Sequence, residues 1–160
     1  MPINPITAYT IQYLGKNVQC ANKNRNYCCF DKSKTDLIIR EGKDALPYIE
    51  QVLKTTNDTR AVLDGLYILN RMLDNNVEGI DKMYPTLSRF NNTNSPDIQV
   101  MLAGIYRKTL VPDAFGPLNK MLLKQTFYPN SPYFDPTEEI GGAILEYIKS
   151  YGAKQAYNEN

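Results

Sequence analysis

The sequence predicts an all-α protein built as a short stack of helical hairpins. The first observation behind this prediction is a pattern that recurs after 39 residues, so that Asp58–Tyr67 matches Asp97–Tyr106. Besides the terminal aspartates and tyrosines, the matched pairs are Leu63 with Leu102, Gly65 with Gly104, and Leu66 with Ile105. A fixed period of this size is typical of stacked hairpins. The second observation is that apolar residues recur at helical spacing from residue 33 to about residue 150.

The first hairpin is expected over residues 33–54. Gly42 is expected to supply the positive φ angle that ends its first helix. Asp44 is a candidate N-cap for the second helix, because its carboxylate can accept hydrogen bonds from the first free N–H groups. Pro47 falls in the opening turn of that helix, where a missing N–H group costs little.

The remaining helices follow the same plan. They are expected over Asp58–Leu73, Val77–Phe90, Asp97–Leu110, Pro112 to about Phe127, and Asp135 to about Gly152. Pro85 and Pro117 occupy the place that Pro47 has in the first hairpin. Gly65 and Gly104 lie mid-helix, where glycine costs roughly 1 kcal/mol relative to alanine. We therefore expect each to contact a neighbouring helix so closely that a larger side chain would not fit.

Three regions are expected along the chain. Residues 1–32 form an N-terminal arm that is partly irregular, with at most a short helix from Ile6 to Leu14. Residues 33–152 form the helical stack, and the polar residues 153–160 form a frayed C-terminal tail.

The segment Ala45-Leu46-Pro47-Tyr48-Ile49 has counterparts at Met83–Leu87 and Phe115–Leu118. With these proline-marked helices, residues 33–150 resemble the HEAT-repeat (armadillo-like) family in its small bacterial form. The resemblance implies a short right-handed α-α superhelix of about three to four HEAT-like hairpins. It also implies that the second helices of the hairpins line a concave face.

Charge argues against nucleic acid as a partner. The formal net charge is +1, and residues 35–160 carry a balance of −3, which does not suit phosphate binding. Residues 1–34 carry +4 and form a basic flank. No apolar run approaches the roughly 18 residues that a membrane span needs.

All three cysteines, Cys20, Cys28 and Cys29, lie in this flank. An odd number cannot pair completely within one chain. We interpret them as reduced thiols and expect a cytoplasmic protein. An alternative is that the arm tethers the protein to an acidic partner, or to a membrane through a modified cysteine.

Catalysis is not expected. The chain has no histidine, so the commonest general base and metal ligand is absent. The acidic pair Glu138-Glu139 suits the first turn of a helix, and the cysteine spacing matches no common zinc pattern. We expect neither a catalytic residue, nor a metal, nor a cofactor.

The sequence predicts instead a protein–protein interaction or scaffold module that holds an unidentified protein or peptide on its concave face. Positions counted from each proline give the residues that we call the predicted contact row: Tyr48, Gln51, Lys54, Arg89, Lys120 and Lys124. The alternative is a bilin-lyase-like or other HEAT-like enzyme or accessory factor, since some HEAT-like proteins resemble bilin lyases or their chaperones and others are DNA glycosylases. The oligomeric state stays open.

Overall fold

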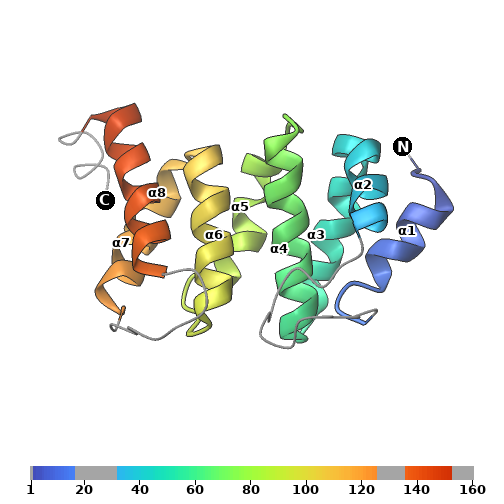
Figure 1. The fold of residues 1–160 in the computed structure, drawn as a ribbon, viewed down its shortest axis with the longest axis horizontal. Coiled ribbons are helices and arrows are strands. Elements are labelled where there is room, and N and C mark those ends of the chain that lie inside the picture. The colour runs from blue at the N-terminus through green and yellow to red at the C-terminus, as the bar shows by residue number, and fades with distance from the viewer. Residues whose placement is uncertain (1, 17–31, 126–135, 153–160) are drawn as a thin grey trace. The chain divides into compact units, whose positions relative to one another are not determined.

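The regular structure of the described residues is helical. The computed structural model describes residues 2–16, 32–125 and 136–152, and within these ranges all regular elements are helices (Figure 1). The predicted all-α class is thus confirmed for the described part of the chain. The chain divides into two compact units, Met1–Thr86 and Leu87–Asn160, and each is described by itself below.

In the described residues of the first unit, four α-helices come first and pack on one another. They are α1 (Pro5–Gln12), α2 (Lys32–Glu41), α3 (Leu46–Thr55) and α4 (Thr59–Asp74), with a 3₁₀ turn at Gly42–Ala45 between α2 and α3. Helix α1 contacts both α2 and α3, and α4 contacts both of them in turn. The short N-terminal helix expected at Ile6–Leu14 therefore exists, and it is part of the packed unit. Expectations for residues 17–31 and 153–160 lie outside the described residues.

Local signals place several helix ends in this unit. Gly42 has a φ of +65° directly after α2, as predicted. Asp58 caps α4, because its side chain accepts a hydrogen bond from the Arg60 N–H at 2.9 Å. The prediction for Asp44 is wrong. Asp44 lies inside the 3₁₀ turn, and the cap residue of α3 is Ala45, which makes no side-chain cap bond. Because the 3₁₀ turn continues directly into α3, the residue at the cap position is Ala45 and not Asp44.

The expected helix over Val77–Phe90 is interrupted. Gly79 adopts a φ of +103°, and a 3₁₀ turn (Ile80–Met83), the short helix α5 (Tyr84–Leu87) and a second 3₁₀ turn (Ser88–Phe90) follow. Pro85 is the second residue of α5, as Pro47 is the second residue of α3, so both prolines lie in the first turn of a helix.

The described residues of the second unit form three α-helices. They are α6 (Pro96–Thr109), α7 (Phe115–Leu123) and α8 (Pro136–Tyr151), with a 3₁₀ turn at Pro112–Ala114 before α7. Helix α8 packs on both α6 and α7. The Tyr147 hydroxyl donates to the Val111 carbonyl at 2.6 Å, and the Tyr151 hydroxyl donates to the Leu110 carbonyl at 2.7 Å. Two tyrosines of α8 thus hold the turn that joins α6 to α7.

Two boundaries in this unit differ from the prediction. Helix α6 starts at Pro96, with Ser95 as its cap, so Asp97 lies in the first turn instead of opening the helix. Helix α7 ends at Leu123, four residues before the predicted end. Within the described ranges, no helix combines the length and the apolar character needed to cross a lipid bilayer.

Candidate functional site

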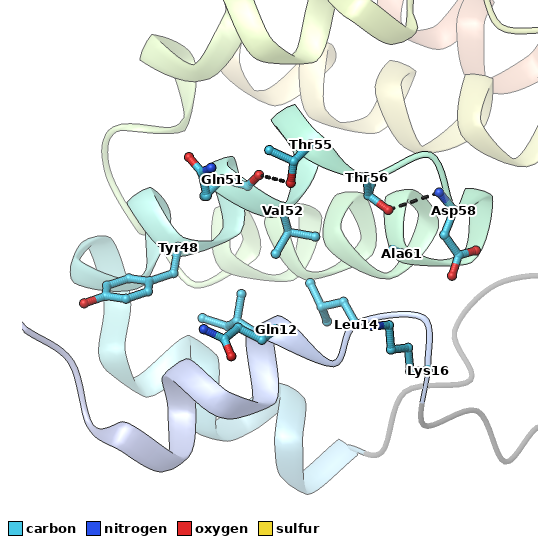
Figure 2. Close-up of a pocket in the computed structure, with 11 residues that line it drawn as sticks. Gln12, Leu14, Lys16, Tyr48, Gln51, Val52, Thr55, Thr56, Asp58 and Ala61 are labelled. Carbon is cyan, nitrogen blue, oxygen red and sulfur yellow. Dashed lines mark hydrogen bonds between the residues drawn. The ribbon is translucent and has the colours of Figure 1, made fainter.

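The candidate site is a pocket of about 360 Å³ in the first unit, which we call the α1–α3 groove (Figure 2). Its walls come from the C-terminal end of α1, from the length of α3 and from the start of α4. The lining residues are Ile11, Gln12, Leu14, Lys16, Tyr48, Gln51, Val52, Thr55, Thr56, Asp58 and Ala61.

The floor of the groove is apolar. Figure 2 shows Val52 of α3 pointing toward Leu14, which follows α1. Ile11 and Leu14 are buried, as is Ala61 at the start of α4. Apolar side chains from three segments therefore meet beneath the opening, as they do in many ligand pockets.

The rim of the groove is polar, and hydrogen bonds order part of it. The Thr55 hydroxyl donates to the Gln51 carbonyl at 2.9 Å, and the Thr56 hydroxyl accepts from the Asp58 N–H at 3.0 Å (Figure 2). These bonds fix the end of α3 and the start of α4. Near this end, the rim carries one positive charge, on Lys16, and one negative charge, on Asp58. Tyr48 lines the opposite end, near the start of α3.

The α1 wall is anchored at its C-terminal end by a turn at Gly15. The Gly15 N–H donates to Asp64 Oδ2 at 2.7 Å, and both residues are buried. Gly15 has a φ of +81°, and a Cβ atom there would lie 2.5 Å from the Ala61 backbone nitrogen. Only glycine allows this approach, so the residue fixes where α1 ends against α4.

The N-terminal end of α1 is anchored on α2. Glu41 Oε1 accepts from the Asn4 N–H at 3.1 Å and from the Thr7 hydroxyl at 3.0 Å. Asn4 also caps α1 by accepting from the Ile6 N–H at 2.8 Å. The groove is thus formed between helices whose ends are tied by hydrogen bonds.

Burial changes the titration of Asp64. Desolvation raises the pKa of its carboxyl group from 3.8 to about 6, although the hydrogen bond from Gly15 lowers it. The nearby Asp58 carboxylate raises the pKa further, and the Arg60 guanidinium lowers it. Asp64 does not line the groove, but it binds Gly15, which follows the groove residue Leu14.

Three residues of the predicted contact row lie on α3. Tyr48, which is half-buried, and Gln51, which is exposed, both line the groove. Lys54 is exposed outside the lining, and its Nζ lies 3.8 Å from Glu50 Oε1.

The other three residues of the row, Arg89, Lys120 and Lys124, are exposed in the second unit. The Arg89 guanidinium lies 5.1 Å from the centroid of the Phe90 ring. The row as a continuous surface stays a prediction, because the two units are described separately.

The α1 side of the groove was not predicted from the sequence. Ile11, Gln12, Leu14 and Lys16 fall in the region that was expected to be an arm. The helical spacing from Ile6 to Leu14 was the available signal. It predicted a helix, but nothing local showed that this helix packs on α3.

The described residues contain a second pocket but no cluster suited to a metal ion. A pocket of about 340 Å³ lies beside the start of α3, and its rim carries charges of both signs from Lys43, Asp44, Glu50, Glu78 and Lys82. Glu50 is already engaged there, since it accepts from the Thr86 hydroxyl at 3.0 Å. Among the described residues, no cluster of three or more histidine, cysteine or acidic side chains could hold a metal ion.

Comparison with known proteins finds no matching protein-family model, no matching curated protein and no matching solved structure.

Proposed function

We propose that this protein is a non-catalytic interaction module that binds a short extended segment of a partner protein in the α1–α3 groove. The observation that carries the proposal is the arrangement of the groove, with an apolar floor beneath a rim of amides and hydroxyls. Tyr48 and Gln51, two residues of the predicted contact row, line it. Their place supports the prediction that contacts with a partner come from α3.

The dimensions suit a peptide. Helix α3 has 10 residues, and at about 1.5 Å per residue it is roughly 15 Å long. An extended chain rises about 3.3 Å per residue, so about four or five residues would lie along α3.

The chemistry of the rim suits a peptide backbone. The side-chain amides of Gln12 and Gln51 offer donors as well as acceptors, which match the alternating N–H and C=O groups of an extended chain. An aliphatic side chain of the partner would enter above Val52 and Leu14, where apolar surface contributes about 25 cal/mol per Å².

A matched pair of substitutions on α3 tests this proposal. Peptides selected from a random library with the full chain as bait would be measured by fluorescence anisotropy against Gln51→Trp and Lys54→Trp. Both positions are exposed, so both variants should fold. We expect Gln51→Trp to fill the groove and weaken binding at least about tenfold, which corresponds to about 1.4 kcal/mol. Lys54 belongs to the predicted contact row but lies outside the lining, so on this proposal Lys54→Trp should leave binding unchanged and Lys54 would drop out of the row.

Unchanged binding by Gln51→Trp would contradict the proposal. Equal loss in both variants would place the contact on the exposed surface of α3 and outside the groove. Lys120→Ala and Lys124→Ala then test whether the second unit takes part, as the predicted contact row requires.

We also propose that the hairpins are of the HEAT type and that the protein is cytoplasmic. The proline in the opening turn of α3 and the packing of α3 on α4 support the first statement. A crystal structure of the full chain tests it, since a HEAT stack must show a right-handed superhelix. Fractionation of cells that express a tagged full chain tests the second statement.

A further inference from the structure

The charges that line the α1–α3 groove lie at one of its ends. Of the described residues that line it, Lys16 and Asp58 are the two that carry a charge. Lys16 follows α1 and Asp58 precedes α4, so the two charges come from different sides of the groove. Figure 2 shows both at the same end, whereas Tyr48 lies at the other end. The groove therefore has one neutral end and one end that carries both signs of charge.

Both charges can pair with a ligand. Lys16 and Asp58 are exposed, and within the described residues neither belongs to an ion pair. Lys16 Nζ lies 5.7 Å from the centroid of the Tyr13 ring, a contact that leaves its positive charge in place. Asp58 Oδ1 caps α4 by accepting from the Arg60 N–H at 2.9 Å, and a carboxylate has a second oxygen that can accept further bonds.

An extended peptide in the groove would meet these two charges with two neighbouring residues. Successive side chains of an extended chain point to opposite sides. When one side chain points toward the turn after α1, the next therefore points toward the start of α4. Complementary charges favour the right partner and like charges disfavour the wrong one. An acidic peptide residue thus suits Lys16, and a basic neighbour suits Asp58.

We propose that the partner segment carries an acidic residue directly beside a basic one, and that this charged pair binds at the end of the α1–α3 groove where Lys16 and Asp58 lie. The acidic side chain faces Lys16, and the basic side chain faces Asp58. The other peptide residues along α3 are uncharged, because the rest of the lining is apolar or neutral. This inference rests on the proposed function and adds the charge pattern and the register of the bound segment.

The charged pair selects the partner more than it strengthens binding. Lys16 and Asp58 are exposed, and ion pairs between exposed side chains are weak. Loss of one such pair should weaken binding only about two- to fivefold. Salt screens charges of this kind, so the effect should be larger at low salt than at about 0.15 M salt. The apolar floor contributes in either condition.

Double-mutant cycles between the protein and its peptide test each charge. Peptides selected from a random library with the full chain as bait should contain an acidic residue beside a basic one. In fluorescence anisotropy, Lys16→Gln should weaken binding about two- to fivefold, and this loss should vanish for a peptide whose acidic residue is replaced by glutamine. Asp58→Asn keeps a good helix cap and removes the charge. Its loss should vanish when the basic peptide residue is replaced by glutamine.

Reversal of one charge should change the preferred peptide. Lys16→Glu should bind a peptide with lysine in place of the acidic residue more tightly than it binds the original peptide. Arg40→Gln and Asp81→Asn are the matched controls, since each removes one charge from an exposed position of the first unit outside the lining. Both should bind the original peptide as the wild type does.

Selected peptides that lack the charged pair overturn the inference, and so does a loss in Lys16→Gln that persists with the neutral peptide. An equal loss in Arg40→Gln also overturns it, because binding would then follow the net charge of the protein. Gln51→Trp tells this failure from that of the proposed function. Peptides that Gln51→Trp weakens but Lys16→Gln does not would contradict the charged pair alone. A library without binding peptides, or binding that Gln51→Trp leaves intact, would contradict both.

Discussion

Asp64 shows how a single residue can depart from the repeat that surrounds it. The 39-residue repeat aligns Asp64 with Ala103, and both side chains are buried in helices. Asp64 is tolerated because the Gly15 N–H donates to it. A buried carboxylate without such a bond would cost several kcal/mol. The bond joins residues 49 positions apart, so it could not be predicted from the 39-residue repeat.

The raised pKa of Asp64 predicts how stability depends on pH. Between its ordinary pKa of 3.8 and its folded value of about 6, the folded protein holds the proton more tightly than the unfolded chain. Unfolding releases that proton, so the contribution of Asp64 to stability falls as the pH rises through this interval. Over the whole interval the loss is at most about 3 kcal/mol.

Asp64→Asn keeps an oxygen that can accept from Gly15 and removes the titration. Urea unfolding at pH 4, 5, 6 and 7 measures the free energy of unfolding of both proteins. The free energy of the variant should rise relative to that of the wild type across this range, and most of this relative rise should be complete slightly above pH 6. Parallel stability curves for the two proteins would contradict the assignment.

Tyr67 and Tyr106, which occupy equivalent positions in the 39-residue repeat, also differ in burial. Tyr106 is fully buried, and its hydroxyl donates to Asn91 Oδ1 at 2.6 Å, whereas Tyr67 is half-buried. Equivalent positions in the sequence therefore do not imply equivalent surroundings.

At the scale of elements, Gly65 sets the approach of α4 to α3. A Cβ atom at this position would lie 3.0 Å from Leu53 Cδ2, and Leu53 is itself fully buried on α3. The close contact that the sequence predicted for Gly65 is confirmed. The corresponding contact at Gly104, which is half-buried in α6, stays a prediction.

Substitution of two helical glycines should have opposite effects. Gly65→Leu should lower stability by about 1–3 kcal/mol, because the core around Leu53 would be overpacked. Gly141→Ala in α8 should raise stability by up to about 1 kcal/mol, because nothing lies within 4 Å of the added Cβ and alanine favours helix. Thermal unfolding followed by circular dichroism measures both. A melting temperature that is unchanged in Gly65→Leu would refute the close packing, and Gly104→Leu extends the test to α6.

Helix boundaries mark the limit of sequence analysis at this scale. Asp58 caps α4 as predicted, because a cap bond depends on residues two or three positions apart. Asp44 and Asp97 resemble it in sequence, but the chain enters α3 through a 3₁₀ turn and Ser95 caps α6 first. Several neighbouring residues could each cap a helix equally well, so the sequence did not show which of them does.

At the scale of the whole molecule, the cysteines predict a redox state. All three lie outside the described residues, and the expectation rests on their odd number. A thiol reagent added to denatured protein that was purified without reductant should detect three thiols per chain. Detection of one thiol would indicate a disulfide and argue against the cytoplasmic proposal. A reductant should not change the melting temperature.

The all-α class, helices near the predicted positions, the turn at Gly42 and the cap at Asp58 could all be predicted from the amino-acid sequence. These features depend on interactions within a few residues, which leave a pattern in the chain. The packing of α1 into the first unit, the hydrogen bond from Gly15 to Asp64 and the groove between α1 and α3 are seen only in the folded protein. Each of these depends on residues that are distant in sequence and meet only when the helices pack, so the groove could be predicted only on its α3 side.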